Sequence, residues 1–444
     1  MHRLAQFCLI AQIILAPVML GGARPWAMAI LSILTGIGSL AMIAAARNLI
    51  LRRYVLYVWI LVAGLIGWSV LQSMPVWPIQ PFPFEAPYIA LYPGGWIDLS
   101  ARLIWLAGTI TLGSLITQLH PGHWQIIVGK AVIASCCLQL ILATGNAAFD
   151  WQTTFWFVKT AHIGDWTGSF ANRNAFGILM ASGSMTCLWF FVRYPDQSTG
   201  KRLDQSGSYL ALAILFTAAL IQSHSRSAIF AIIIATILFV TLCSSRQSGL
   251  ARLRRFFAAT AGAVIVLALV ASAEPELFIR FADLGRLDLI QRDDAWLTAI
   301  HAIAERPITG YGANSIPLVM AHVATPDLNT NAHWFSSHNL WLDGAIMFGI
   351  PVTMAVALSL ITAIVFILRH AANLPNRAFG TALISIALIG SFSDWVISLP
   401  ALILPMVAMW VAGLEGRLVS PFEFPERADH AAQSPLPDQE TLRQ

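Results

Sequence analysis

Long apolar runs separated by short polar segments recur from one end of the chain to the other. A helix that crosses a bilayer needs about 20 apolar residues, and its backbone groups must bond within the helix because no water reaches them. The pattern therefore predicts an all-α polytopic membrane protein with about 12 transmembrane helices. The expected spans are 4–20, 25–46, 54–72, 100–118, 124–144, 173–192, 208–222, 226–243, 256–273, 341–368, 378–393 and 398–413.

The composition supports this pattern and excludes a water-soluble domain. Apolar residues make up 57% of the chain and charged residues only 11%, and the mean hydropathy is +0.70. The first run is expected to be a retained helix, because only Arg3 could form a signal-peptide n-region and no small-residue cleavage site follows. The five cysteines fall within expected spans, so they indicate packing rather than disulfides or a zinc site. The net charge of +4 is small, and we expect no nucleic-acid partner.

The positions of arginine and lysine predict the orientation of the helices. Cytoplasmic loops retain positive charge, and the loops after the second, sixth, eighth and tenth expected spans are basic. With these loops in the cytoplasm, both termini are cytoplasmic. The residues concerned are Arg47, Arg52, Arg53, Arg193, Lys201, Arg202, Arg246, Arg252, Arg254, Arg255, Arg369 and Arg377.

A single long loop, between the ninth and tenth expected spans, lies on the opposite face. It is too long for a simple connector and indicates function. The chain is therefore divided into an N-terminal bundle (1–273), a large loop (274–340), C-terminal transmembrane helices (341–413) and a disordered cytoplasmic tail (414–444). Shorter segments on the same face are 74–99, 145–172 and the turn at His224 and Ser225.

Two polar motifs lie where spans begin on the face of the large loop. In the first, Asn172 is expected to cap the sixth span and Asn174 to lie in its first turn. The two asparagines are consistent with a simple helix cap. They are equally consistent with a polar rim of a binding site that holds a sugar or phosphate group. In the second, Ser225 and Arg226 follow a very short turn, which places Arg226 at the membrane surface. Its guanidinium either reaches lipid headgroups or forms a fork for a substrate phosphate.

A third motif lies in the large loop. Residues 289–305 have helical periodicity that places Arg292 and Trp296 on one face, and Pro307 is expected to end the helix before a turn at Gly310 and Gly312. An amphipathic surface helix would have the same pattern. The adjacent carboxylates of residues 293 and 294 point apart on a helix, so they do not favour a metal site.

The fourth motif is His338 and Asn339, where the large loop re-enters the membrane. Histidine titrates near neutrality and can accept a proton from a hydroxyl group. A helix N-terminus beside it would favour an anionic ligand. A purely structural histidine remains the alternative for this residue taken alone.

Taken together, the four motifs resemble the bacterial O-antigen ligase and polymerase family over roughly residues 165–355. The resemblance rests on the polar segment at 168–174, the pair Ser225 and Arg226, the Arg292-x3-Trp296 pattern with Pro307 and Gly-x-Gly, and His338 with Asn339. It implies a glycosyltransferase of the GT-C type in the bacterial inner membrane. Such an enzyme moves a glycan from undecaprenyl diphosphate to an acceptor hydroxyl at the periplasmic face.

The chemistry of these residues agrees with that implied reaction. Arg226 and Arg292 are expected to stabilise the negative charge of the diphosphate leaving group, a task for which other enzymes use a metal. His338 is expected to act as the general base. Asn172, Asn174, Ser225, Trp296 and Asn339 are the expected substrate-binding residues. No cofactor or metal is expected, and direct displacement would invert the anomeric configuration.

Several alternatives remain open at this point. An O-antigen ligase, which uses lipid A-core as acceptor, is favoured over a polymerase of O-antigen or exopolysaccharide, and a related branch of the family glycosylates proteins. A transporter or flippase would be expected to carry its polar residues at the membrane midplane rather than at one face. A membrane protein that only recruits partners would not need a histidine and two arginines on the same face.

Overall fold

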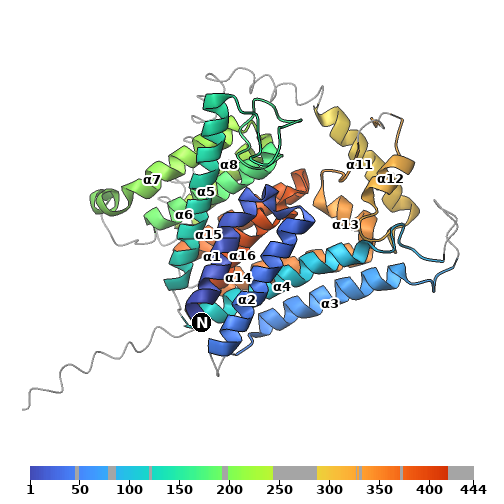
Figure 1. The fold of residues 1–444 in the computed structure, drawn as a ribbon, viewed down its shortest axis with the longest axis horizontal. Helices are drawn as coiled ribbons and strands as arrows, with labels where there is room; N and C mark the ends of the chain where they lie inside the picture. The colour runs from blue at the N-terminus through green and yellow to red at the C-terminus, as the bar shows by residue number, and fades with distance from the viewer. Residues whose placement is uncertain are drawn as a thin grey trace, which may run out of the picture.

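The computed structural model describes residues 1–45, 50–78, 87–119, 123–192, 199–243, 288–326, 328–329, 333–370 and 374–418. Within these ranges the protein is helical, apart from one isolated β-bridge between Thr153 and Val158 (Figure 1). The α-helices are α1 (His2–Val18), α2 (Pro25–Ala45), α3 (Arg53–Ser73), α4 (Gly95–Leu119), α5 (His123–Phe149), α6 (Arg173–Val192), α7 (Thr199–Gln222), α8 (Arg226–Cys243), α11 (Asp288–Glu305), α12 (Ile316–His322), α13 (Leu340–Phe348), α14 (Ile350–His370), α15 (Leu374–Ser393) and α16 (Pro400–Leu418). Short 3₁₀ turns are η1 (Leu20–Gly22) and η3 (Val396–Ser398).

Six of the described helices are long and apolar enough to cross a membrane: α2, α3, α4, α5, α6 and α8. Shorter apolar helices accompany them in α1, α7, α14 and α16. The prediction of an all-helical polytopic membrane protein is therefore confirmed in its class. The expected span 256–273 and the tail from residue 419 lie outside the described residues, so the number of twelve spans stays a prediction.

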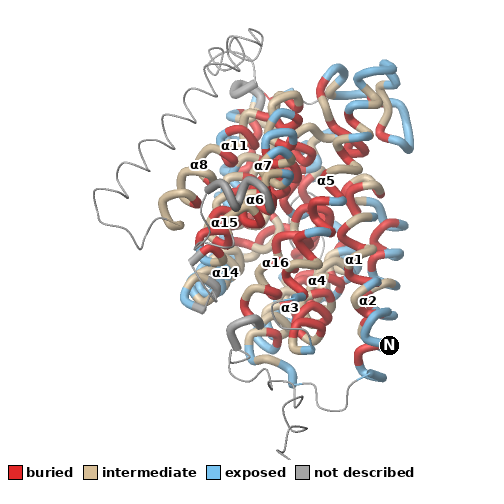
Figure 2. The backbone as a smooth tube through the Cα atoms, turned by 90° about the vertical axis from the view of Figure 1, so that its left-hand side faces the viewer, coloured by how far each residue is buried: buried red, intermediate tan, exposed pale blue. Residues whose placement is uncertain are grey.

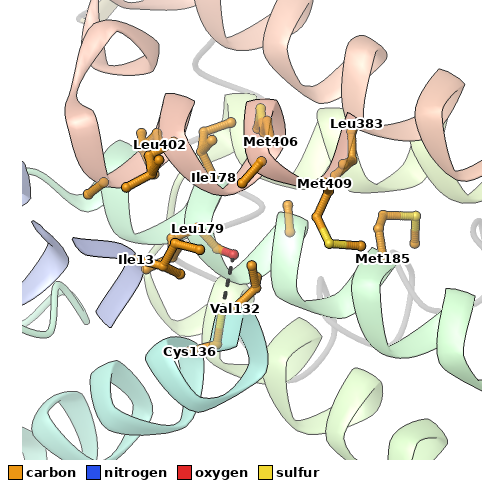
Figure 3. Close-up of a cluster of buried hydrophobic side chains, with 14 of the residues drawn as sticks. Ile13, Val132, Cys136, Ile178, Leu179, Met185, Leu383, Leu402, Met406 and Met409 are labelled. Carbon is orange, nitrogen blue, oxygen red and sulfur yellow. Dashed lines mark hydrogen bonds between the residues drawn. The ribbon is translucent and has the colours of Figure 1, made fainter. Parts of the chain in front are cut away.

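Helix α6 is the centre of the bundle. In the most apolar stretch of α6, 83% of the residues are buried, whereas in the corresponding stretch of α3 only 17% are buried. Small side chains allow this burial, because a Cβ on Gly183 would clash with the sulfur of Cys136 on α5. Such small residues let transmembrane helices approach closely. Around α6, side chains from α1, α5, α15 and α16 form one continuous hydrophobic core (Figure 3).

The outer helices present apolar side chains outward. On α2 and α3, buried positions face the bundle while exposed leucines and isoleucines cover the other side (Figure 2). The described side chains of α14 are exposed or half-buried, and they include exposed leucines and isoleucines. A soluble protein would rarely expose so many large apolar residues, whereas lipid tails solvate them. This arrangement follows from the uniformly apolar composition of these helices.

A second, smaller core joins α11, α12 and α13 beside the main bundle (Figure 1). It contains Tyr311, Val319 and Ile346. The expected helix at 289–305 is confirmed as α11, which ends at Glu305 shortly before Pro307.

The expected span 341–368 is not one helix. It is divided at Gly349, where φ is +81°, into α13 and α14. The chain after Pro307 lies against this break, and a Cβ on Gly349 would clash with the carbonyl oxygen of Ile308. Tertiary contact with this segment therefore interrupts a run that hydropathy alone reads as continuous.

Candidate functional site

Asp394 lies where three of the sequence motifs meet. It follows the last residue of α15 and is 1% exposed. Its Oδ2 accepts a hydrogen bond from Nδ2 of Asn174 at 2.6 Å, and its Oδ1 lies 3.3 Å from Nδ1 of His338. Asp394 therefore links the start of α6 to the turn before α13.

Arg292 reaches the same point from α11. Its Nη1 donates to the carbonyl oxygen of Ser393 at 3.3 Å, next to Asp394. Burial by itself raises the pKa of the Asp394 carboxyl, but hydrogen bonds from His338 and Asn174 and the charge of Arg292 outweigh it and hold the pKa below its usual value. The carboxyl is consequently ionised at neutral pH.

Ser225 extends the network towards Arg226. Its Oγ donates to Oδ1 of Asn174 at 2.8 Å, and it also accepts a long bond of 3.4 Å from the backbone N–H of Ala228. Arg226 is the first residue of α8 and is half-buried. The pair Ser225 and Arg226 is thereby attached to Asp394 through a single intervening residue, Asn174.

Two asparagines expected to bind substrate have helix-capping roles. Asn172 accepts the backbone N–H of Asn174 at 2.7 Å and caps α6, as predicted. Asn339 accepts the backbone N–H groups of Trp341 and Leu342 at 3.0 and 3.2 Å and caps α13. Their contact with a substrate stays a prediction.

His338 occupies a tightly held turn. Its φ is +58°, and its side chain is 32% exposed. The buried carboxylate of Asp343 accepts hydrogen bonds from the side chains of Ser336 and Ser337 at 2.5 and 2.7 Å, and from the backbone N–H of Ser337 at 2.8 Å. The imidazole is thus partly accessible while its backbone is fixed from within α13.

The segment 307–312 connects α11, which carries Arg292, to α13, which follows the turn of His338. The backbone N–H groups of Tyr311 and Gly312 donate to the carbonyl oxygens of Ile346 and Met347 at 2.8 and 2.9 Å. These are orphan carbonyls at the C-terminus of α13. A Cβ on Gly310, whose φ is +64°, would lie 2.6 Å from the backbone nitrogen of Gly349. The expected turn at Gly310 and Gly312 therefore has a structural reason.

Trp296 lies one helical turn after Arg292 on α11. Its indole N–H is buried and has no hydrogen-bond partner in the described part of the chain. Its contact with a substrate stays a prediction. Asp293 is exposed and Asp294 is buried, as expected for neighbouring helix positions.

A second acidic centre, Asp165, flanks the network. It lies 2.9 Å from Nη1 of Arg173 and 2.7 Å from Nδ1 of His224, the neighbours of Asn174 and Ser225 in the chain. His162 lies 3.7 Å away. Burial raises the pKa of Asp165, but its hydrogen bonds to His162, His224 and Arg173 prevail and hold it far below its usual value. The ion pair ties the chain before α6 to the turn between α7 and α8.

Sequence reasoning identified His338, Arg292, Asn174 and Ser225 but missed Asp394 and Asp165. A signal for Asp394 was present: it is an ionisable residue in a short turn between two apolar runs, like Arg226. Asp165 lies in a long polar segment where nothing in the local pattern distinguishes it. The network as a whole combines a histidine oriented by a carboxylate with cationic side chains.

A comparison with known protein families finds a match over one part of the chain. Residues 211–357 match the family model described as O-antigen ligase. The match extends from within α7 to within α14 and contains Ser225, Arg226, Arg292 and His338. No curated protein matches the chain. The match supports the resemblance to the O-antigen ligase family and contains three of its four motifs, while the polar segment at 168–174 lies outside it.

Proposed function

We propose that this chain, with its O-antigen ligase region, is a membrane glycosyltransferase of the bacterial inner membrane. It transfers a glycan from undecaprenyl diphosphate to an acceptor hydroxyl at the periplasmic face, with lipid A-core as the acceptor. Both termini lie in the cytoplasm, and the large loop of residues 274–340 carries Arg292 and His338. The observation that carries the proposal is the junction of His338, Arg292 and Asn174 at the buried carboxylate of Asp394.

His338 is the general base of this reaction. Because the carboxylate of Asp394 is ionised, it can only accept a hydrogen bond, so Nδ1 of His338 carries the shared proton. The other ring nitrogen, Nε2, then has a free lone pair. This tautomer is the one that accepts a proton from an acceptor hydroxyl.

Arg226 and Arg292 neutralise the leaving group. As the acceptor oxygen forms its bond to the anomeric carbon, the bond from that carbon to the diphosphate oxygen breaks, and the electron pair leaves with the diphosphate. The hydroxyl proton passes to Nε2 of His338, and attack from the opposite side inverts the anomeric configuration. Arg292 uses one N–H on the carbonyl of Ser393, which leaves its other donors for phosphate oxygens.

The test is turnover of lipid-linked glycan by the purified protein. Wild type should consume the donor in detergent, where no compartment exists for transport, and His338→Ala should reduce the rate about 10²–10⁴-fold. The matched control is His301→Ala, an exposed histidine on α11, which should keep the wild-type rate. Donor consumption without glycan transfer, or an active His338→Ala, would refute the proposal.

The product distinguishes the two candidate activities of the family. A glycan joined to lipid A-core identifies a ligase, whereas a lengthened lipid-linked glycan identifies a polymerase, which uses the same base and the same leaving group. Since the arginines replace a metal ion in this mechanism, the rate should be unchanged in excess chelator.

A further inference from the structure

The chain between α5 and α6 exposes an unusual concentration of aromatic side chains. Over residues 149–159 the only charged side chains are Asp150 and Lys159. Two pairs of rings are in contact: Phe149 with Trp151 at 5.0 Å and Phe155 with Trp156 at 5.3 Å between centroids. The exposed apolar residues are Phe149, Trp151, Phe155, Trp156, Phe157 and Val158.

This segment is a fixed hairpin. The backbone N–H of Thr154 donates to the carbonyl of Phe157 at 2.9 Å, and that of Lys159 donates to Gln152 at 2.7 Å. Phe155 at the tip has a φ of +78°, which is uncommon for a bulky side chain. The outward direction of the rings is therefore imposed by the backbone of the aromatic hairpin, residues 152–159.

An open apolar pocket of about 510 Å³ lies between the aromatic hairpin and the turn joining α1 to α2. Trp156 connects the aromatic hairpin to the α1–α2 turn. Its indole N–H donates to the carbonyl of Val18 at 2.5 Å, and its ring centroid lies 5.1 Å from that of Trp26. Exposed Arg24 is the one cation of the lining. The lining residues are Leu20, Arg24, Trp26, Trp156 and Phe157.

The pocket lies at the same end of the bundle as the candidate site. Ser169, just before α6, donates to the carbonyl of Pro17 at 2.8 Å. A Cβ on Gly21 would lie 3.1 Å from Leu399 and 3.2 Å from Phe170, so the α1–α2 turn packs on the segments that carry Asp394 and Asn174. Tryptophan and arginine at the ends of spans are typical of the level where acyl chains meet headgroups.

The proposed reaction brings two membrane-anchored molecules to one site, because donor and acceptor are both lipids. The arginines assigned to the donor diphosphate come from α8 and α11. No residue of the pocket belongs to these helices or to the turn of His338. The pocket thus offers a separate apolar surface with its own cation.

We propose that this pocket seats the lipid anchor of the acceptor, with an acyl chain against Trp26, Trp156 and Phe157 and a phosphate group on Arg24. The assignment rests on the proposed function, since it names the acceptor of that reaction. Charge complementarity favours a phosphorylated lipid, and the aromatic lining favours its acyl chain.

Photo-crosslinking tests whether the pocket binds the acceptor lipid (the lipid seat), and it does not require turnover. Benzoylphenylalanine replaces Phe157 in the full chain, native membranes containing lipid A-core are irradiated, and the adduct is identified by mass spectrometry. We expect an adduct with lipid A-core, and Arg24→Ala should reduce its yield about five-fold, as expected for one cation near a lipid phosphate. The matched control is benzoylphenylalanine at Ile163, an exposed residue of the same loop outside the pocket.

Three outcomes would overturn the assignment: no adduct at Phe157, an adduct with glycerophospholipid only, or equal lipid A-core yields at Phe157 and Ile163.

Kinetics provide a second measurement. Arg24→Glu should raise the KM for the acceptor several-fold and leave the KM for the donor unchanged. Arg24→Lys should restore the acceptor KM to the wild-type value. An equal rise for donor and acceptor would contradict the seat. If the adduct forms but wild type transfers no glycan, the proposed function fails and the lipid seat remains. If transfer occurs without the adduct, only the seat fails.

Discussion

His338 and Asp394 are 56 residues apart in the chain, yet Nδ1 of the imidazole lies 3.3 Å from a carboxylate oxygen of the aspartate. One residue lies in a turn fixed by Asp343, and the other follows the end of α15. In the proposed reaction this contact orients the imidazole and leaves Nε2 as the nitrogen that accepts a proton.

Asp394→Asn should reduce kcat by about 10²–10⁴-fold while donor binding changes little. A neutral amide can donate to Nδ1 and so favour the tautomer whose Nε2 carries the proton and cannot act as a base. The measurement is the initial rate with donor affinity on one purified sample, and thermal stability serves as the folding control. A wild-type rate in well-folded Asp394→Asn would show that the pairing has no catalytic consequence.

Replacing Arg226 by lysine should reduce activity about ten- to a hundred-fold although the charge is kept. An ammonium group cannot form the two parallel hydrogen bonds of a guanidinium, and a hydrogen bond to a charged group contributes about 1.5–3 kcal/mol. Arg292→Ala should have a loss of similar size. Arg377→Lys, at an exposed position on α15, is the matched control and should remain active. An unaffected Arg226→Lys would instead indicate a residue that contacts lipid headgroups.

Gly310→Ala should destabilise the protein by about 1–3 kcal/mol, because the residue has a positive φ and its Cβ would meet the backbone of Gly349. Thermal unfolding in detergent measures the change. Gly67→Ala on α3 is the matched control, since a Cβ there meets nothing within 4 Å. It should leave the melting temperature unchanged or raise it slightly. Equal melting temperatures for the two variants would contradict the packing argument.

The ion pair of Asp165 should stabilise the fold in a pH-dependent way. Its pKa is lower in the folded protein than its ordinary value of 3.8, so the stabilisation is complete above that value and disappears as pH falls towards the lowered pKa. Wild type should therefore melt higher than Asp165→Asn from pH 7 to 5, and the difference should shrink below about pH 4. A difference that is independent of pH would mean that the carboxylate charge makes no contribution.

The orientation of the helices can be tested by labelling single cysteines from the periplasmic side. A cysteine at Asn314, exposed in the segment before α12, should react, and one at exposed Arg377 should be shielded. Buried Ala313 would be a poor label position despite its neighbourhood. The native cysteines are buried or half-buried and are replaced in the background. Reaction at Arg377 alone would reverse the orientation.

Much of the helical architecture follows from local pattern, because hydropathy and capping act over one helix at a time. The span 173–192 coincides with α6 and 226–243 with α8, since Asn172 and Ser225 lie just before them. The break at Gly349 could not be predicted from the local pattern, because its cause is a contact with Ile308, 41 positions earlier in the chain (349 − 308). A hydropathy window contains no information about such a neighbour.

The sequence by itself determined that the protein is a helical membrane protein and which residues are candidates for its chemistry. An apolar span must be a helix because the bilayer offers no partner for backbone groups, and Arg226 stands out because charge is costly at a membrane boundary. Only the tertiary structure decided that Asp394 lies beside His338 and that Trp156 bonds to Val18 at an apolar pocket. Each of these pairs joins distant segments through one directional hydrogen bond, whose partner is chosen by the packing of the bundle.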